Sequence, residues 1–498
     1  MTVPFAQIPA GDAIRVPLFY AEIDPSQANT AQLIQRALII GQKTSAGTYP
    51  PNLPVLVQSV TAGIQGGGAG SLLADMIKTY RLNDTFGELW ALPLVDDGAA
   101  VAATGSISFT GPTTAVGVLS LYVAGQKVSI ALASGTTAAQ AATAVAAAIN
   151  AATALPVTAA VDGTTTSKVN VTAKNAGATG LDIDMRVGFR GAPGGERTPA
   201  GLGVTIVAMT GGATPPSLTA ALANLQDEPF DFIVSPYNDP TTIAAITAFL
   251  NDSTGRWSWQ TQVYGHCFIA KRGSQGALAT FGNGLNDQHL SCMGIYDSPS
   301  PSWEWAAAMA GAAAVSVRAD PGLPLQTLAL RGVLAPHLGG RFSLSQRNTL
   351  LFDGISTFSV ASDDTPLIEN VITTYQFNAL GDPDNSYVQV ETMFLLMYVL
   401  RQLSTVITTK YARKKLKANG TRIAPGSNVV TPNTIRADLI AKYSEMEEQG
   451  YVQQSDTFAE NLVVEKNATA PNRVDVLYPA ILIDQLRIFA LLMQFRLQ

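Results

Sequence analysis

The side chains best suited to metal binding or redox chemistry are three histidines and two cysteines. His266 and His289 lie beside Cys267 and Cys292 in apolar stretches, and His337 stands apart. Two cysteines with two histidines suggest zinc, but the chain has no CxxC or HxxxH spacing, on which structural zinc sites depend. We interpret the two cysteines and the two histidines beside them as core or strand-end side chains and predict no metal site and no bound cofactor.

A nucleophilic centre is the second chemistry to consider. The chain has many serines and aspartates, but none stands in the GxSxG turn that exposes the serine of α/β hydrolases. The acidic pairs Asp96–Asp97, Asp363–Asp364 and Asp382–Asp384 have the composition of turns. The segment Ser235–Asp239 follows an apolar run, where α/β proteins often build sites. No catalytic set emerges, so we predict no enzyme; an α/β hydrolase with an inserted binding domain is the alternative.

The glycine run Gly63–Ser71 invites comparison with phosphate-binding loops. It lacks the Lys-Ser/Thr of a P-loop, and its glycine spacing does not give GxGxxG. We interpret it as a loop that leads into a helix over residues 72–82, with Ser71 as the N-cap. The predicted buried face of that helix consists of Leu72, Leu73, Met76, Ile77 and Tyr80.

Composition narrows the class of protein. The chain has 498 residues, of which 47% are hydrophobic and 14% charged, with a net charge of −6. A typical soluble chain is about 25% charged. So little charge indicates either a surface covered by partners or a large globule that dilutes its charges. The chain has no excess of basic residues that would indicate binding to nucleic acid. Two cysteines and no signal-peptide pattern favour a cytosolic product. The apolar run Met393–Leu400 is too short to span a bilayer and predicts a buried helix.

Strands and helices alternate through the middle of the chain. Apolar runs predict strands at 37–40, 55–60, 230–235, 263–270 and 289–296, and periodicity predicts helices at 240–250, 275–281 and 301–317. This alternation predicts a mainly parallel sheet with helices on both faces. Beyond residue 353 we expect hairpin strands, a helix over 387–416 that ends in a basic turn, a loop over 419–433 and a helix over 434–449.

A segment poor in charge interrupts this pattern. Between residues 98 and 180 the only charged side chains are Lys127, Asp162, Lys168 and Lys174. Strands are predicted at 106–110, 117–123, 126–132, 157–161, 168–173, 182–187 and 203–209, with an alanine-rich helix at 137–151. Turn residues mark both boundaries, so we predict a compact α+β domain inserted at 96–212.

Both ends of the chain carry strand patterns. Val474, Val476 and Tyr478 alternate ahead of Pro479, and a second alternation runs through Phe489, Leu491, Met493, Phe495 and Leu497. A helix over 481–492 is an alternative for part of this stretch. Near the N-terminus Ile14, Val16, Leu18 and Tyr20 alternate around Pro17, which favours a sheet edge. These strands either complete the chain's own core or are donated to a neighbouring copy.

Several stretches resemble a known family. The run PVLVQSVTAGIQGGGAGSLLADMIKTYRLNDTFGELWALPL resembles the sheath proteins of contractile phage tails, particularly the Mu-like group. So do LQDEPFDFIVSPYNDPTTIAAITAFLND and GRWSWQTQVYGHCFIAKRG, and the resemblance covers essentially the whole chain. One departure is Gln65-Gly-Gly-Gly-Ala, where a bulkier and more polar approach to the following helix is expected.

The resemblance implies an α/β and α+β multidomain fold for a structural sheath subunit. It implies an N-terminal arm at 1–24, a core at 25–95 and 213–360, an outward-facing β-rich domain at 96–212, an inner domain at 361–472 and a C-terminal strand arm at 473–498. Subunits of this kind stack in six-fold rings around a tail tube and contract to drive the tube through the host envelope. The two arms add strands to a sheet of neighbouring subunits.

The resemblance also implies partners and contact residues. The partners are further copies of the chain, the tail tube protein, and the baseplate and tail terminator proteins, without nucleic acid or membrane insertion. The subunit would assemble in the host cytoplasm and end in the virion tail; a bacterial contractile injection system is not distinguished from a phage. Strand addition falls on Ile14, Val16, Leu18, Tyr20, Val474, Val476, Phe489, Leu491, Met493 and Phe495. Tube contact falls on Lys410, Arg413, Lys414 and Lys417, or Arg436 and Lys442, although a solvated helix face also accounts for these cations.

Overall fold

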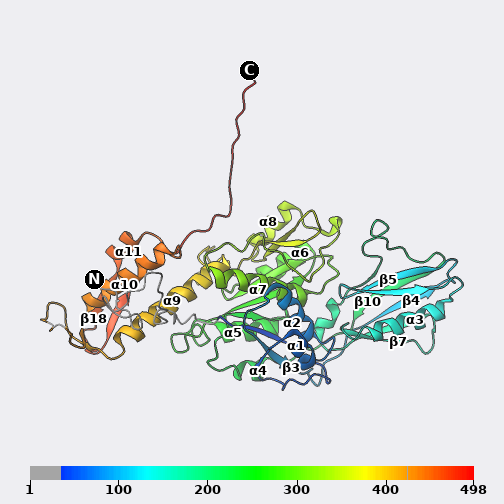
Figure 1. Ribbon diagram of the computed structural model, residues 1–498, viewed down its shortest axis with the longest axis horizontal. Coiled ribbons are helices and arrows are strands. Elements are labelled where there is room, and N and C mark those ends of the chain that lie inside the picture. Colours follow the sequence, from blue (N-terminus) through cyan, green and yellow to red (C-terminus); the bar gives the residue numbers. More distant parts are fainter. Residues whose placement is uncertain (1–34, 423, 425, 498) are drawn as a thin grey trace, which may run out of the picture.

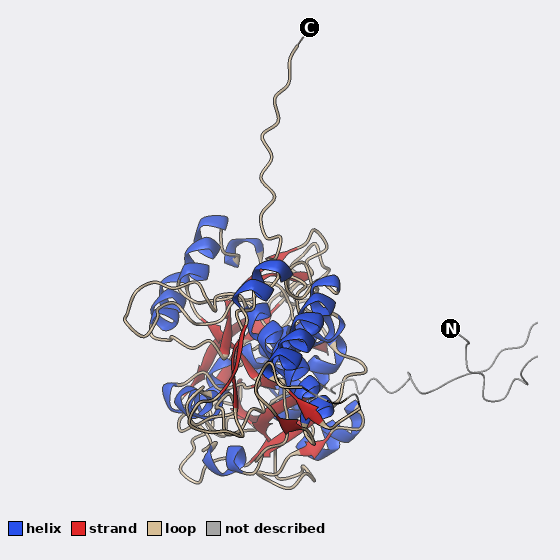
Figure 2. Ribbon diagram, turned by 90° about the vertical axis from the view of Figure 1, so that its left-hand side faces the viewer, coloured by secondary structure: helices blue, strands red, loops and turns tan. Residues whose placement is uncertain are grey.

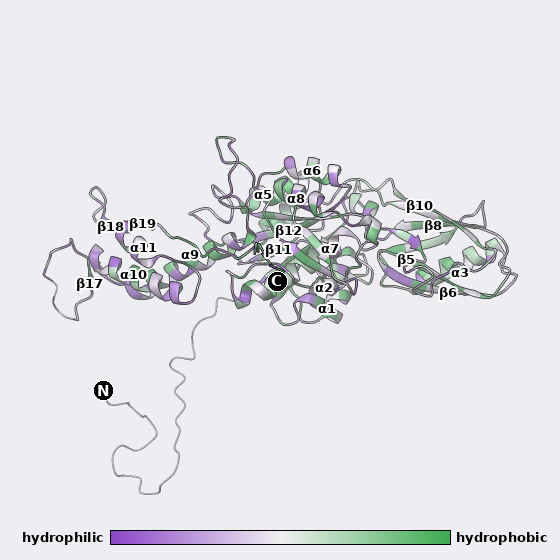
Figure 3. Cartoon of the chain, turned by 90° about the horizontal axis from the view of Figure 1, so that it is seen from above, coloured by the Kyte–Doolittle hydropathy of each residue, from purple (hydrophilic) through white to green (hydrophobic). Residues whose placement is uncertain are grey.

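In a computed structural model, which describes residues 35–497 apart from 423 and 425, the chain forms three lobes in a row (Figure 1). A core of parallel sheet and helices lies in the middle. The 104–210 module lies at one end, and a C-terminal lobe of residues 411–482 lies at the other. Apolar residues concentrate on the strands and helices of the core, whereas α10 in the C-terminal lobe carries many hydrophilic residues (Figure 3).

The core sheet has the order β13-β12-β11-β1-β3-β2, and every neighbouring pair is parallel except β2 with β3. This confirms the predicted mainly parallel sheet. Its strands are β1 Ala37–Gln42, β2 Val55–Leu56, β3 Leu89–Leu94, β11 Phe232–Val234, β12 His266–Arg272 and β13 Leu290–Ile295. Alternate residues of β1 enter different apolar layers, since Ala37 and Ile39 pack with one cluster and Leu38 and Ile40 with another.

Helices cover both faces of this sheet, as the alternation predicts. One face carries α2 Leu72–Asn83 and the long α7 Ser302–Ala319. The other carries α4 Thr219–Ala223, α5 Pro240–Leu250, α6 Gln275–Asn283 and α8 Leu344–Phe352. Helix α2 begins where predicted, because the Ser71 side chain accepts a hydrogen bond from the Ala74 amide. All five residues predicted for its buried face are buried.

The predicted loop at Gly63–Ser71 is wrong, because most of the run is helical. Helix α1 spans Val60–Gly67, and the strand expected over 55–60 is correspondingly short. Glycine is a poor helix former, so tertiary packing must stabilise α1. A Cβ on Gly66 would lie 2.3 Å from the ring of Tyr49, and the Tyr49 amide donates to the Gly66 carbonyl at 3.0 Å. The glycines let the loop over 44–49 lie directly on the helix.

The 104–210 module consists of two antiparallel sheets and one helix. Its elements are β4 Thr104–Thr110, β5 Gly117–Val123, β6 Gln126–Leu132, α3 Ala138–Ala151, β7 Val157–Val161, β8 Lys168–Ala173, η3 Ala178–Asp182, β9 Met185–Val187 and β10 Gly203–Thr210. The strand orders are β10-β4-β8-β7 and β6-β5-β9. The predicted strands are confirmed except that residues 178–182 form a short 3-10 helix and β9 begins later. Helix α3 starts with a capping box between Thr137 and Gln140.

The C-terminal part contains a hairpin, a long strut and a small lobe. The hairpin is β14 Thr357–Val360 with β15 Pro366–Asn370, and η4 Leu338–Gly340 precedes it. The strut α9, Val390–Tyr411, ends before the predicted 416. The lobe contains β16 Lys415–Leu416, β17 Val429–Val430, α10 Pro432–Glu448, α11 Ser455–Asn461, β18 Val463–Lys466 and β19 Val474–Leu477. Neither α11 nor β18 was predicted from the sequence.

Helix α9 is long and apolar enough, by length and composition alone, to cross a membrane. Its first half instead packs into the core, where the ring of Phe394 stacks on that of Phe232 at 5.0 Å between centroids. Met393, Leu395 and Met397 are also buried. The predicted buried helix at Met393–Leu400 is confirmed.

Candidate assembly interface

His266, His289 and both cysteines sit deep in the core, whereas His337 is exposed and its ring lies 4.4 Å from that of Phe189. His266 Nε2 and Ser291 Oγ are 2.8 Å apart, but both residues are fully buried, and His266 Nδ1 has no hydrogen-bond partner. Burial, together with the nearby His289, lowers the pKa of His266 well below its ordinary value. A serine and histidine without an orienting carboxylate or access to solvent have no route to a substrate.

The cysteines are equally enclosed. Cys267 and Cys292 are free thiols, and burial raises the pKa of each, that of Cys292 to about 12. Among the described residues, no three His, Cys, Asp or Glu side chains come close enough to hold a metal ion. His289 Nε2 lies 2.9 Å from Asp252 Oδ1, and its ring stacks on Trp257. These contacts are those of packed strand-end residues.

A cavity of about 580 Å³ does open at the carboxyl end of β11 and β12, beside Ser235–Asp239. Its polar groups are paired with one another. Asn238 donates to the Ala270 carbonyl at 3.0 Å and accepts from Lys271 Nζ at 2.9 Å. The Asp239 carboxylate caps α5 through the Thr242 amide. The chain itself therefore uses the side chains that a ligand would need.

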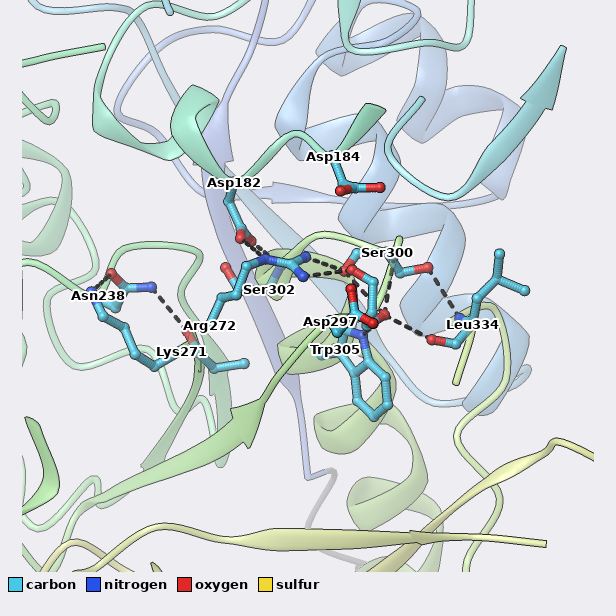
Figure 4. Close-up of polar contacts among 12 residues, drawn as sticks. Asp182, Asp184, Asn238, Lys271, Arg272, Asp297, Ser300, Ser302, Trp305 and Leu334 are labelled. Atoms are coloured by element: carbon cyan, nitrogen blue, oxygen red, sulfur yellow. Dashed lines mark hydrogen bonds and ion pairs between the residues drawn. The ribbon is translucent and has the colours of Figure 1, made fainter. Parts of the chain in front are cut away.

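The 104–210 module reaches into this same edge through Asp182. The Asp182 carboxylate pairs with the Arg272 guanidinium and accepts from the Ser302 amide at the start of α7 (Figure 4). Arg272 also donates to the carbonyls of Ser298 and Ser300, at 2.5 and 2.7 Å. A helix N-terminus beside a guanidinium is a strong site for an anion. Here a carboxylate of the module fills it, so this edge of the sheet is a joint between two lobes.

A second polar joint lies around Asp96. Gln42 is fully buried on β1 and donates to Asp96 Oδ1 at 2.7 Å and to the Ala176 carbonyl at 2.6 Å. Asn175 donates to Asp96 and to the Lys43 carbonyl, and the Ala176 amide donates to Asp96 Oδ2. Two separate carboxylate clusters thus hold the module on the core.

Helix α9 links the core to the C-terminal lobe through a buried ion pair. Both Nη atoms of Arg401 lie 2.6 Å from the carboxylate of Asp231, next to β11. The side chains are 14% and 1% exposed. This bidentate geometry fixes the angle at which α9 leaves the core.

The predicted C-terminal strand residues fall in two different settings. Val474 and Val476 belong to β19, which pairs antiparallel with β18 of the same chain. Val476 stays 44% exposed, although it lies opposite the buried Val464 of β18. The segment from Ile488 onwards leaves the body as an extended stretch of chain, without regular secondary structure and without partners among the described residues (Figure 2).

That free segment is strongly apolar. Phe489, Leu491, Met493 and Phe495 are between 75% and 81% exposed, and Ile488, Leu492 and Leu497 are at least as exposed. The alternative helix over 481–492 is absent. Soluble subunits seldom leave so many large apolar side chains in water unless they form an interface. Ile14, Val16, Leu18 and Tyr20 lie outside the described residues.

The candidate tube-facing cations also divide into two groups. Arg413 and Lys414 are exposed between α9 and β16, and Lys417 is exposed directly after β16. Lys410, at the end of α9, lies 3.3 Å from Asp438. Arg436 instead donates to the carbonyls of Ala459 and Leu462. Lys442 is paired with Glu445 at 2.9 Å. The available charge therefore lies on residues 413–417.

Comparison with known proteins identifies the family of the chain. Two family models match: the phage tail sheath protein central domain over residues 211–374 and the phage tail sheath C-terminal domain over residues 382–496. The Mu-like prophage FluMu tail sheath protein of Haemophilus influenzae is 37% identical over 497 residues, which cover 99% of this chain and 100% of that protein. The chain belongs to the phage tail sheath family.

Solved structures with lower identity were also found. The sheath tail protein of Desulfitobacterium hafniense is 14% identical, with 94% of this sheath chain and 97% of that chain covered and a TM-score of 0.48. A chain from the contracted anti-feeding prophage baseplate is 12% identical, with 97% and 100% covered and a TM-score of 0.49.

Sequence reasoning missed the polar joints of this sheath chain. The partners in the Asp182–Arg272 and Asp231–Arg401 pairs are 90 and 170 residues apart in sequence. The position of Ser235–Asp239 at the end of a predicted strand indicated this edge of the sheet. It did not indicate that the edge forms a contact between two lobes.

Proposed function

We propose that this chain is the mechanical subunit of a contractile phage tail sheath. Subunits polymerise as stacked six-fold rings around the tail tube, and their contraction drives the tube through the host envelope. The proposal assigns no catalytic activity. The observation that supports the proposal most strongly is the C-terminal segment 488–497. It is apolar, exposed and extended, and it leaves the body without a partner among the described residues.

The segment suits donation to the sheet of a neighbouring copy. Strand addition satisfies its backbone amides and carbonyls and removes apolar side chains from water. Burial of a Phe, Leu or Met side chain contributes about 1.5–3 kcal/mol. Ordering this segment costs at most about 1–2 kcal/mol per residue. The side chains on the face of Phe489, Leu491, Met493 and Phe495 therefore offset part of that cost, and the backbone hydrogen bonds of strand addition contribute the rest. The donating arm is then 488–497, with 1–24 as a second arm.

The receiving surface is proposed to include the β18–β19 hairpin. β19 has an edge unpaired among the described residues, and Leu477 is 65% exposed. Contacts of this head-to-tail kind do not close on themselves and so build a helical tube. The 104–210 module lies farthest from the C-terminal lobe and is proposed to face outward (Figure 1).

The basic segment 413–417, around β16, is proposed to face the tube. Arg413, Lys414, Lys415 and Lys417 are exposed there, and no carboxylate occurs between residues 392 and 435. Such a segment fits an acidic partner surface. The remaining proposed partners are the baseplate and tail terminator proteins, with no nucleic acid and no membrane insertion. Assembly is in the host cytoplasm and the product is part of the virion.

Electron microscopy of the purified chain tests the proposal. The full-length chain should form long hollow tubes, and a variant that ends at Arg487 should stay as soluble subunits. The cut belongs at Arg487, since residues 473–487 pack within the body. The control is the full chain with Gln494→Ala, which should still form tubes. Small compact particles from every variant would refute the proposal and reopen the alternative of an enzyme with its site at Ser235–Asp239.

A further inference from the structure

The C-terminal arm departs from the subunit at one defined point, Arg487. We infer that Arg487 and Glu391 form a releasable latch, which holds residues 478–487 as a strap across the C-terminal lobe and the core and sets the exit direction of the arm. The role of the latch in assembly rests on the proposed strand donation. The latch itself is a property of the single subunit.

The strap is fastened to the C-terminal lobe along its first half. The Ile481 amide donates to the Tyr443 hydroxyl at 3.0 Å, and the Gln453 amide donates to the Ile481 carbonyl at 2.9 Å. The Ile483 amide donates to the Tyr451 carbonyl at 3.2 Å. These bonds make residues 481–483 a short strand against the turn that follows α10.

The second half of the strap lies on the core. Ile483 packs so closely on Gly322 that a Cβ there would lie 3.2 Å from the Ile483 side chain. Gln326 Nε2 donates to the Leu486 carbonyl at 3.4 Å. The strap therefore crosses from one lobe to the other, and its last contact is the Arg487 side chain.

That contact is an ion pair in a nearly closed pocket. Glu391 is fully buried in the first turn of α9, where a carboxylate also gains from the helix dipole. Its Oε1 accepts from the Leu325 amide at 2.5 Å and lies 2.7 Å from Arg487 Nη2. The Arg487 side chain is 17% exposed.

The pair is only partly satisfied, and this makes it releasable. Glu391 Oε2 and all three guanidinium nitrogens of Arg487 are buried without hydrogen-bond partners, so the 2.7 Å contact with Nη2 is an ion pair that lacks hydrogen-bond geometry. Buried charges with unmet hydrogen bonds lose much of their attraction to desolvation. The Asp231–Arg401 pair contrasts with it, since both Nη atoms there are bonded. A force applied to residue 488 acts first on the weaker Arg487–Glu391 contact. When that ion pair breaks, the strap is released between the two lobes.

Limited trypsin digestion of the full chain, at concentrations too low for polymers, tests the latch. Trypsin cuts after Arg496, which is exposed, and after Arg487, which the latch hides. Cleavage of a protected site follows the population of the opened state. Of these two sites, mass spectrometry of the unmodified chain should show cleavage after Arg496 first. Glu391→Gln should speed cleavage after Arg487 by about tenfold or more, because loss of the charge opens the latch.

The controls separate a latch from a general loss of structure. Glu369→Gln removes the partner of Arg347 in a comparable ion pair away from the arm, and should leave both cleavage rates unchanged. Cleavage after Arg487 as fast as after Arg496 in the unmodified chain would overturn the inference, as would an unchanged rate in Glu391→Gln.

A second variant keeps the test decisive if Glu391→Gln fails to fold. Arg487→Met keeps an unbranched apolar side chain but removes the guanidinium group and its charge. Hydrogen exchange of the Ile481 and Ile483 amides should then accelerate about tenfold or more, with α10 unchanged. Unchanged exchange at both amides would overturn the latch. Both measurements use single subunits, so a failure of the full chain to form tubes would refute the proposed function and leave the latch result standing.

Discussion

The Asp231–Arg401 pair should be one of the most sensitive points in the molecule. Asp231→Asn keeps the shape of the side chain but removes its charge. Arg401 would then stay buried without an anion, with the cation of Arg256 nearby. Breaking one side of a buried, bonded pair costs about 3–5 kcal/mol. The exposed pair Arg341–Asp364 provides the control, since Asp364 is 79% exposed and Asp364→Asn should cost about 0–1 kcal/mol.

Hydrogen exchange is the suitable assay, because a chain of several lobes does not unfold in one step. A loss of 3–5 kcal/mol raises the exchange rates of the β11 amides and the first half of α9 roughly a hundred- to several-thousand-fold. The double variant Asp231→Leu with Arg401→Met should recover most of the protection, because it leaves no unpaired charge. A rise below about threefold in Asp231→Asn, or a rise equal to that of Asp364→Asn, would refute the view that this pair holds the strut.

Three further predictions concern assembly and pH. Leu491→Ala should raise the critical concentration for tubes about 10- to 100-fold, measured by sedimentation, whereas Gln494→Ala on the other face should change it less than about threefold; equal effects would contradict a one-faced interface. Burial raises the pKa of Asp75 to about 7, so its stabilising contribution is complete below about pH 4 and is lost as the pH rises to about 7. Asp75→Asn should therefore reduce the loss of hydrogen-exchange protection of the α2 amides between those pH values, after correction for intrinsic exchange rates; an unchanged loss of protection would count against a neutral Asp75. Lys414→Glu should weaken binding of subunits to an acidic tube at low salt, while Lys442→Glu should not. Equal losses of bound tube protein in a pull-down would exclude the segment 413–417 as the contact.

Local patterns predicted the elements well, because each depends on residues close in sequence. The strands β5, β6, β7 and β8 begin and end where alternation placed them. Helix α5 starts at Pro240 because Asp239 caps it. The apolar residues of β1 alternate between two core layers, as a strand buried on both faces requires.

The features that local patterns could not predict depend on distant partners. Helix α1 contains glycines that oppose helix formation, and only its contact with Tyr49 explains them. Asp182 reads as a strand residue in sequence, but it fills the helix N-terminus of another lobe. Glu391 reads as a residue at the edge of an apolar helix, and its role depends on Arg487, 96 positions later.

The β18–β19 hairpin has a consequence for how the subunit exists before assembly. A sheet of two strands is marginally stable on its own. If a neighbour's arm supplies its third strand, then part of the folding free energy of this lobe arrives only on association. Folding and polymerisation then share one equilibrium, and the melting temperature of the lobe rises with protein concentration. Under the proposed strand donation, dilute subunits are the least stable form and therefore the most accessible to proteases. Incorporation into a tube would then protect this lobe from cleavage.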